Sequence, residues 1–350
     1  MLFSINYKKT FRLTIAAFTL LVFYSCNKEF DKITSNQIGV IGGQTAGDLI
    51  DSDQSFSILK AALSKAGMLA TLKNPGSRFT VWASDDAALT ASGISLNVVN
   101  TLPASQLQSI FSYHIIPQAL PAAQIPTSFP NIQMPTLLPL SQTNPLVKMS
   151  IFPSRRDNSL FVNNIPVTQS DIVVANGVVH KVARLVAPPT QLIAQVLAAD
   201  PELSFFRAAI ARADSGQVGL NRLDSAMRFG LANLTVFAPD NDAVKQFLIG
   251  LGLPPVEAAF NFLPVQTVRG VVAYHLLGVR AFSVNLPSTT SPILTLLGGS
   301  PFPALTVDRS LLIPRLLGAG NGDQYANFLS VDKHAVNGVV HIIDRVLRPQ

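Results

Sequence analysis

The pentapeptide Asn-Gly-Val-Val-His occurs twice in this chain, at residues 176–180 and again at residues 337–341. A Tyr-His pair lies 66 residues before each terminal histidine, at Tyr113-His114 and at Tyr274-His275. Two paired landmarks at the same separation indicate an internal duplication. Each unit of about 140–160 residues has the length of an independent globular domain with its own core.

A further match extends the repeat and shows that the second copy is longer. Phe-Thr-Val-Trp-Ala-Ser-Asp at 79–85 corresponds to Leu-Thr-Val-Phe-Ala-Pro-Asp at 234–240. The displacement between matching segments grows along the chain, so the second unit carries additional residues. Because exposed loops tolerate insertions, we expect the extra stretches Asp214–Arg228 and Leu248–Pro255 to be surface loops.

Local patterns predict a mixture of helices and strands in each unit. Apolar residues recur at helical spacing from Phe56 to Leu63 and again from Leu203 to Ile210. The β-branched and aromatic run Phe79–Ala83 predicts a strand. An aspartate follows this strand and its counterpart, and we expect Asp85 and Asp240 to cap helices.

Each pentapeptide lies between runs of β-branched residues, which predicts a hairpin. Asn-Gly supplies the positive φ angles of a type I′ turn, so we expect such turns at Asn176-Gly177 and at Asn337-Gly338. Side chains alternate along the strand that follows, which places His180 and His341 on its inward face. Both histidines are therefore expected to be hydrogen-bonded core groups.

The Tyr-His pairs follow helical segments, 102–113 in the first unit and 268–274 in the second. A histidine at a helix end can bond to the terminal carbonyl groups while its ring is buried. We therefore expect structural roles for Tyr113, His114, Tyr274 and His275. Seven prolines between Pro117 and Pro145 predict an extended, irregular segment at a sheet edge.

These motifs together resemble the fasciclin-like domain, present as a tandem pair. The matching blocks are the Thr-Val strands that end in Asp, the Tyr-His pairs, and Asn-Gly-Val-Val-His followed by a closing proline. The resemblance implies an α+β fold in which each domain, 48–187 and 190–350, is a wedge-shaped β-sandwich with helices packed around it. It also implies a role in adhesion or in contact with extracellular matrix.

The N-terminal sequence resembles an export signal. Basic residues from Lys8 to Arg12 precede the apolar run Leu13–Tyr24, which is too short to span a membrane comfortably. Cys26 is the one cysteine of the chain and follows this run directly. Its position resembles the lipobox of bacterial lipoproteins, so we expect residues 1–25 to be a lipoprotein signal peptide and Cys26 to be lipidated. The alternative is a plain cleaved signal with an incidental cysteine.

The residues after Cys26 suggest where the protein is displayed. Asn-Lys-Glu-Phe-Asp at 27–31 looks like the short acidic signals that direct lipoproteins to the outer face of the outer membrane. Residues 26–47 are polar, without apolar periodicity, and are expected to be a tether. The interpretation is an exported protein anchored in the outer membrane and exposed at the cell surface.

Composition and motifs argue against several function classes. The net charge of +6 falls to +3 without the three basic residues of the signal, and no basic run is interleaved with aromatic residues, so we expect no nucleic-acid partner. The five histidines lack zinc-site spacing, although His334 has no counterpart in the first unit. Two aspartates, Asp240 and Asp242, supply too few oxygens for a cation site. The glycine-rich stretch 317–322 is expected to be a flexible hairpin connection.

No nucleophile elbow, P-loop or dinucleotide fingerprint is present in the sequence. We therefore expect no catalytic residues, no metal and no cofactor. The predicted function is that of a non-catalytic lipoprotein for cell-surface adhesion or for binding matrix or glycan. Its expected partners are an extracellular protein or glycan and, through the lipid anchor, the membrane.

Two alternatives stay open. The first is an accessory binding protein of an outer-membrane polysaccharide-uptake system, for which exposed aromatic residues in one groove would be the distinguishing feature. The second is an enzyme without a recognisable motif, which would require a pocket where carboxylates or histidines converge.

Overall fold

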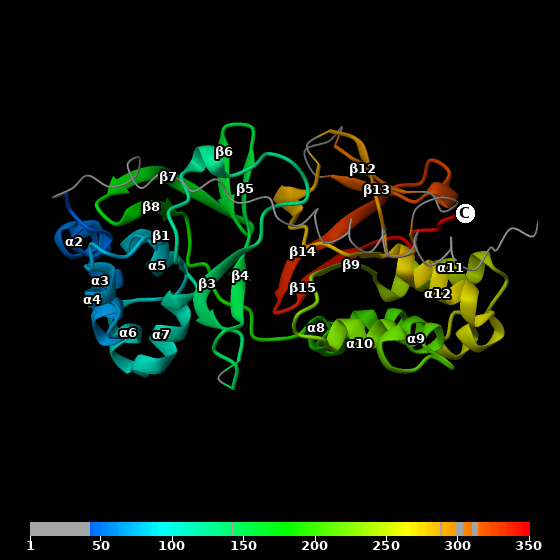
Figure 1. The fold of residues 1–350 in the computed structure, drawn as a ribbon. Helices are drawn as coiled ribbons and strands as arrows, with labels where there is room; N and C mark the ends of the chain where they lie inside the picture. Colours follow the sequence, from blue (N-terminus) through cyan, green and yellow to red (C-terminus); the bar gives the residue numbers. More distant parts are fainter. Residues whose placement is uncertain (1–42, 142, 288, 299–303, 310–313) are drawn as a thin grey trace, which may run out of the picture.

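The computed structural model describes residues 43–350, except residue 142, residue 288 and the segments 299–303 and 310–313. It shows two units side by side, each with a sheet and a group of helices (Figure 1). The predicted signal peptide, Cys26 and residues 26–42 of the predicted tether lie outside the described residues. No helix in the described part of the chain has both the length and the apolar character needed to cross a bilayer.

The first unit contains a six-stranded sheet with the order β2-β1-β8-β7-β6-β5. Its strands are β1 (Phe79–Ser84), β2 (Ile115–Ile116), β5 (Pro153–Arg156), β6 (Ser159–Val162), β7 (Ile165–Val174) and β8 (Gly177–Val182). Strands β1 and β8 are parallel, and the other neighbours are antiparallel. Strand β1 is buried along its whole length, its polar residues Thr80 and Ser84 included.

Helices cover one face of this sheet (Figure 1). They are α2 (Ala46–Ser52), α3 (Ser57–Lys65), α4 (Leu69–Leu72), α5 (Asp86–Ala91), α6 (Leu96–Thr101) and α7 (Ala104–Ser112), with short 3₁₀ turns at η1 (Gln54–Phe56) and η2 (Ala122–Gln124). Val81 of β1 packs into the core beneath the helices, whereas Trp82 packs into a second core on the other face of the sheet. The curled sheet thus closes over a small core of its own.

The second unit repeats this plan. Its seven-stranded sheet has the order β10-β9-β15-β14-β13-β12-β11. The strands are β9 (Leu234–Pro239), β10 (Leu276–Leu277), β11 (Ser291–Ile293), β12 (Leu305–Asp308), β13 (Arg315–Leu317), β14 (Ala326–Ala335) and β15 (Gly338–Ile343). Strands β9 and β15 are parallel, as β1 and β8 are in the first unit. The duplication seen in the sequence is therefore a duplication of topology.

The helices of the second unit also lie against one face of its sheet. They are α8 (Ile193–Ala199), α9 (Ser204–Ala213), α10 (Leu223–Arg228), α11 (Asn241–Gly250) and α12 (Val265–Tyr274), with 3₁₀ turns η3 (Pro201–Leu203), η4 (Gly219–Asn221), η5 (Glu257–Phe262), η6 (Ser283–Asn285) and η7 (Ala319–Asn321). The predicted caps are confirmed, because Asp85 accepts from the Ala88 amide and Asp240 from the Ala243 amide.

The prediction of type I′ turns at Asn-Gly is wrong. The two-residue turns consist of Ala175-Asn176 and Val336-Asn337, and each glycine is already the first residue of the next strand. Neither asparagine has a positive φ. The glycines serve close packing instead, because a Cβ atom on Gly177 would lie 1.9 Å from the carbonyl oxygen of Phe79. A Cβ on Gly338 would lie 2.2 Å from that of Leu234.

The prediction that Asp214–Arg228 is a surface loop is confirmed for the largely exposed residues 215–222 but wrong for Asp214 and for residues 223–228. The buried carboxylate of Asp214 accepts hydrogen bonds from the amides of Leu223 and Asp224, at 2.7 and 2.9 Å, and so begins helix α10. The side chains of Leu223 and Met227 enter the core of the second unit. An insertion that carries its own apolar face can add a helix to the core rather than a loop.

Other irregular segments are more ordered than predicted. Leu248, in the second expected loop, is a buried residue of α11. The proline-rich segment is extended as expected, but it forms a separate hairpin of β3 (Met134–Pro139) and β4 (Lys148–Ile151), not an edge strand of the main sheet. The glycine-rich stretch connects β13 and β14, and a Cβ on Gly320 would lie 2.1 Å from the backbone of Gln350, so this connection is packed tightly rather than flexible.

Candidate functional site

The histidines of the Tyr-His pairs are buried and fully hydrogen-bonded. His114 donates from Nδ1 to the carbonyl oxygen of Ile110 at 2.9 Å, and its Nε2 accepts from the amide of Val186 at 3.0 Å. His275 makes the same two bonds in the second unit, with the carbonyl of Val271 and the amide of Leu347. Each histidine thus ties a helix end to the closing segment of its domain.

The hydroxyl groups of the paired tyrosines are also engaged. Tyr113 donates to the carbonyl oxygen of Ser150 at 3.0 Å, and Tyr274 donates to that of Ala304 at 3.0 Å. Burial raises the pKa of Tyr113 to about 12. These phenols are buried anchors for neighbouring segments rather than surface groups.

The strand histidines are equally enclosed. His180 stacks on Trp82 with ring centroids 4.7 Å apart, and its Nε2 lies 3.0 Å from the carbonyl oxygen of Leu120. The Nε2 of His341 lies 2.8 Å from the carbonyl oxygen of Ala281. The other ring nitrogen of each accepts a backbone amide hydrogen, so both nitrogens of both rings are occupied. Burial lowers the pKa of both rings.

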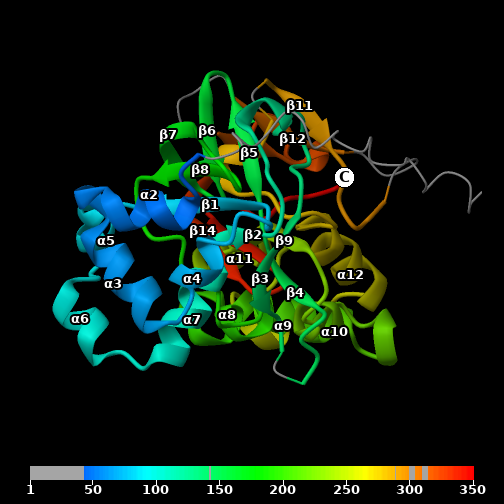
Figure 2. The ribbon, with the colours of Figure 1, turned by 60° about the vertical axis from the view of Figure 1, so that its left-hand side comes forward.

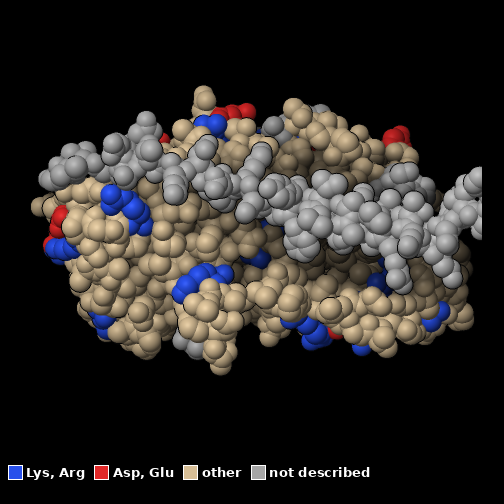
Figure 3. Space-filling model, viewed as in Figure 1, with Lys and Arg blue, Asp and Glu red and all other residues tan. Residues whose placement is uncertain are grey.

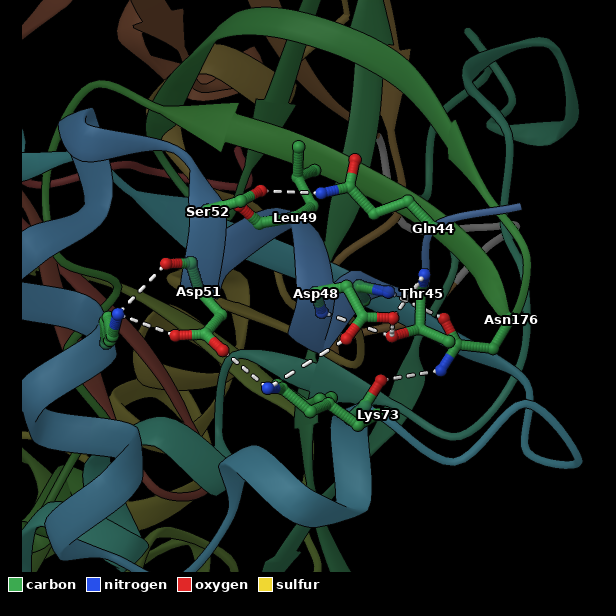
Figure 4. A network of polar contacts seen from close by, with 11 residues as sticks. Gln44, Thr45, Asp48, Leu49, Asp51, Ser52, Lys73 and Asn176 are labelled. Carbon is green, nitrogen blue, oxygen red and sulfur yellow. Dashed lines mark hydrogen bonds and ion pairs between the residues drawn. The ribbon is translucent and has the colours of Figure 1, made fainter. Parts of the chain in front are cut away.

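The pentapeptide asparagines hold the first helix of each domain. Figure 4 shows Asn176 next to Thr45, which caps α2. The Oδ1 atom of Asn176 accepts from the amide of Ala46 at 2.8 Å, and its Nδ2 donates to the carbonyl oxygens of Leu72 and Asn74 at 2.7 and 3.1 Å.

Asn337 repeats this arrangement in the second domain. Its Oδ1 accepts from the amide of Ile193 at 2.8 Å, at the start of α8. Its Nδ2 donates to the carbonyl oxygens of Met227 and Phe229 at 2.9 and 3.1 Å. The repeated sequence motif therefore encodes tertiary contacts between strand and helix layers.

The buried histidines predict acid sensitivity. Burial lowers the pKa of His114 and of His275 from 6.5 to about 4. The unfolded chain therefore binds protons between these two pH values that the folded chain does not. Stability is complete above about pH 6.5 and is lost as the pH falls toward 4, by about 3 kcal/mol per histidine.

Urea unfolding at a series of pH values from 7.5 to about 4 measures this effect. His275→Gln should flatten the pH dependence of the second domain and leave that of the first unchanged. An unfolding free energy that stays constant from pH 7.5 to about 4.5 would contradict the assignment.

The side chains of the motif residues are engaged in internal bonds. A candidate binding surface lies instead at the junction between the domains. Phe152 of the first domain packs with Phe282 and Val339 of the second. The guanidinium carbon of Arg280 lies 4.5 Å from the centroid of the Phe152 ring. Strand β5 of the first domain contacts η6 of the second, and Figure 2 shows β5 near β11 and β12.

Arg280 is the centre of this contact. It is 5% exposed and donates to Asn233 Oδ1, His334 Nε2 and the carbonyl oxygen of Val336, at 3.0, 3.1 and 2.9 Å. Burial lowers the pKa of Arg280 to about 10. Burial and the adjacent guanidinium lower the pKa of His334 well below its ordinary value. The one histidine without a repeat partner is therefore a structural acceptor at the domain junction.

Beside this contact lies an open cleft of about 610 Å³. Its walls come from residues 127–131 and 154–157 of the first domain and from residues 284–293 of the second. A second groove of about 400 Å³ adjoins it, and Arg156 lines both. The volume of the cleft is within the range of small-ligand sites, about 300–1,000 Å³.

Arginine side chains line both the cleft and the adjoining groove. Arg155 and Arg156 of β5 line its first wall, and Arg309, which follows β12, lines the adjoining groove. Charged side chains are sparse on the face in Figure 3, where blue and red surfaces adjoin over the β5–β6 hairpin. Asp157 is the carboxylate of the cleft wall. Within the described residues, no group of three or more His, Cys, Asp or Glu side chains can hold a metal ion.

The sequence did not identify these arginines. Arg155 and Arg156 end β5, and Asp157-Asn158 is the turn before β6, so the adjacent basic pair is the one local signal in the sequence. Arg309 carries no such signal, because it reaches the junction only through the packing of the second domain on the first. A site shared by two domains is not visible from either repeat alone.

Comparisons with known proteins show which family and which proteins this chain is similar to. The family model described as Fasciclin domain matches residues 54–188 and 201–349. The chain is 30% identical over 147 residues to the pig (Sus scrofa) transforming growth factor-beta-induced protein ig-h3, which covers 41% of this chain and 19% of that protein. It is 24% identical over 156 residues to protein sll1483 of Synechocystis sp., covering 44% of this chain and 79% of that protein.

Among solved structures, the chain is similar to a FAS1 domain pair from the insect cell adhesion molecule fasciclin I. The sequence identity is 17% and the TM-score 0.37, with 83% of this chain and 95% of that chain covered. This chain spans only about a fifth of the length of the pig relative. Because the family model covers two long segments that together make up most of the sequence, this chain belongs to the fasciclin domain family, as a tandem pair of domains.

Proposed function

We propose that this protein is a lipid-anchored, non-catalytic adhesion protein that binds an extracellular matrix protein or glycan at the cell surface. Domains of its family are associated with cell adhesion. The single observation that supports a binding role most directly is the cleft at the domain junction, lined by arginines that form no ion pair within the described residues. Cys26, directly after a hydrophobic signal core, supports anchoring in the bacterial outer membrane.

The tether and the paired domains suit such a role. A lipid anchor followed by a polar segment of about twenty residues would present both domains to the surroundings, where weak contacts of many copies add together. The alternative of an accessory protein for polysaccharide uptake has less support at the junction, because Phe129 is the one aromatic residue that lines the cleft among the described residues. Three phenylalanines, Phe206, Phe247 and Phe260, line a separate groove of about 410 Å³ in the second domain. An enzyme has less support too, because the motif histidines use both ring nitrogens for internal bonds.

Adhesion of whole cells tests this proposal. Cells with the anchored protein should adhere to matrix proteins, glycans or neighbouring cells better than a deletion strain does. A strain with Cys26→Ser should lose both a metabolically incorporated fatty-acid label and the gain in adhesion. Equal adhesion of all strains on every surface, together with turnover of a substrate by the purified protein, would favour the enzyme instead.

A further inference from the structure

We propose that the cleft between the two domains binds an acidic polysaccharide, whose sugars carry carboxylate or sulfate groups. This inference rests on the proposed binding function and names its ligand class and its site. The ligand would contact both domains at once.

The three cleft arginines lack partners among the described residues. The side chains of Arg155, Arg156 and Arg309 make no hydrogen bond or ion pair there, and Arg155 Nε and Arg309 Nη2 are buried without any acceptor. Their neighbour Arg315 is different, because it pairs with Asp308 at 2.6 Å. Guanidinium groups present several donors in a planar fork that matches a carboxylate or a sulfate.

Two of these cations approach each other across the domain boundary. Burial and the positive charge of Arg156 lower the pKa of Arg309, whereas Asp157 raises it less. Like charges that face one groove from two domains repel each other, and an anion between them relieves this repulsion. The arrangement therefore favours an anionic ligand that touches both domains.

The cleft wall adds neutral donors. Asn285 is 7% exposed, and its Oδ1 accepts from the hydroxyl group of Ser154 at 2.8 Å, which leaves Nδ2 without a partner. Asn131 Nδ2 is likewise unpartnered. Together with Arg155 Nε, every buried side-chain polar atom without a partner among the described residues of this wall is an N–H donor. Buried donors are normally satisfied, so a ligand rich in acceptor oxygens fits this wall.

The sheet edges favour a glycan over an acidic peptide. An extended peptide commonly binds by adding a strand to an exposed sheet edge. Strands β5 and β11 are the terminal strands of the two sheets beside the cleft, and they contain Pro153 and Pro292. Proline has no N–H group to donate to an added strand. Hydroxyl groups of Ser128, Thr289 and Ser291 also line the cleft and can bond to sugar hydroxyls.

The dimensions suit a chain of sugars rather than a lone ion. The cleft and the adjoining groove, of about 610 and 400 Å³, meet at Arg156. A polysaccharide could therefore lie along the cleft with one acidic group near Arg156 and another near Arg309. Each acidic group would replace water in front of a guanidinium group that has no internal partner.

Titration of the purified mature protein tests the inference. The ligands are polygalacturonate as the carboxylated polymer, dextran sulfate as the sulfated one and neutral dextran as the uncharged control. Wild-type protein should bind at least one acidic polymer far more tightly than neutral dextran. This binding should be weaker at 0.2 M than at 0.05 M salt, because salt screens the charges (the Debye length is about 10 Å at 0.1 M). The acidic polymer that binds shows whether the protein recognises carboxylate or sulfate groups.

The decisive variant is Arg156→Gln/Arg309→Gln, with Arg78→Gln/Arg184→Gln as the matched control. Arg78 and Arg184 are exposed and lie outside the cleft, so both variants lose the same charge. The cleft variant should bind about tenfold more weakly or worse, and the control should bind like wild type. Arg156→Lys/Arg309→Lys keeps both charges and should retain part of the affinity.

Three results would overturn the inference. Equal losses in the cleft variant and the control would show that net charge, not the cleft, attracts the polymer. Polyglutamate bound with the same dependence on Arg156 and Arg309 would assign the cleft to acidic peptides. No binding of either acidic polymer would remove the ligand class, while the adhesion assay above still decides the proposed function separately.

Discussion

Alanine in place of Gly177 should destabilise the first domain by about 3–5 kcal/mol or prevent its folding. Gly177 begins β8 with a φ of +140°, and its added Cβ would lie 1.9 Å from the carbonyl oxygen of Phe79. That carbonyl belongs to the first residue of β1, the parallel neighbour of β8. The two central strands of the sheet would have to move apart to admit one methyl group.

Thermal and urea unfolding of the purified protein measure the loss. Gly93→Ala is the matched control, because Gly93 has a φ of +81° but open space around its Cβ position. It carries the conformational cost of a positive φ without the steric overlap. If Gly177→Ala destabilised the protein no more than Gly93→Ala, close approach of β8 to β1 would not be the reason for this glycine.

Replacing Asn176 with alanine should cost about 3 kcal/mol or more, because two buried backbone groups and one partly buried group lose their partner. The amide of Ala46 and the carbonyl oxygens of Leu72 and Asn74 all bond to this one side chain. The start of α2 and the end of α4 would both lose their tie to the sheet.

Two further variants separate the contributions. Asn176→Asp keeps an acceptor for the Ala46 amide but loses both donors, so it should recover only part of the stability. Asn74→Ala is the control, because the side chain of Asn74 accepts one exposed amide hydrogen, that of Gly76. Hydrogen exchange should show faster opening of α2 in Asn176→Ala, and protection equal to that of wild type would contradict the assignment.

The sequence was sufficient for the fold because its landmarks are repeated. Tyr-His and Asn-Gly-Val-Val-His recur at the same separation, and the structure places both copies at equivalent positions of the same sheet topology. The caps at Asp85 and Asp240 were also predictable, because a cap depends on residues within one turn of itself.

The reason for Asn-Gly could not be found from local sequence. Turn propensity favours a type I′ turn, but tertiary contacts decide this position: the asparagine bonds to a helix more than a hundred residues earlier in each domain. The helix in Asp214–Arg228 was missed for a related reason. Its apolar residues Leu223 and Met227 are too few to show a helical stripe, and a buried carboxylate begins it.

The cleft arginines could not be predicted from the sequence because residues of two domains form the site. Arg156 and Arg309 are 153 positions apart in the sequence, at the end of β5 and directly after β12, two strands that hold the same place in the two sheets. Comparison of the two copies directs attention to what they share, which is the buried framework. The cleft and its adjoining groove are lined by residues of both domains, so neither copy alone contains them.

Adhesion of living cells to an immobilised acidic polysaccharide tests the central claim most directly. Strains should display equal amounts of wild-type protein, of Arg156→Gln/Arg309→Gln or of Arg78→Gln/Arg184→Gln. The account predicts that wild-type and control strains adhere alike and that the cleft variant falls to the level of the deletion strain. Adhesion by the cleft variant equal to that of wild type would contradict the account.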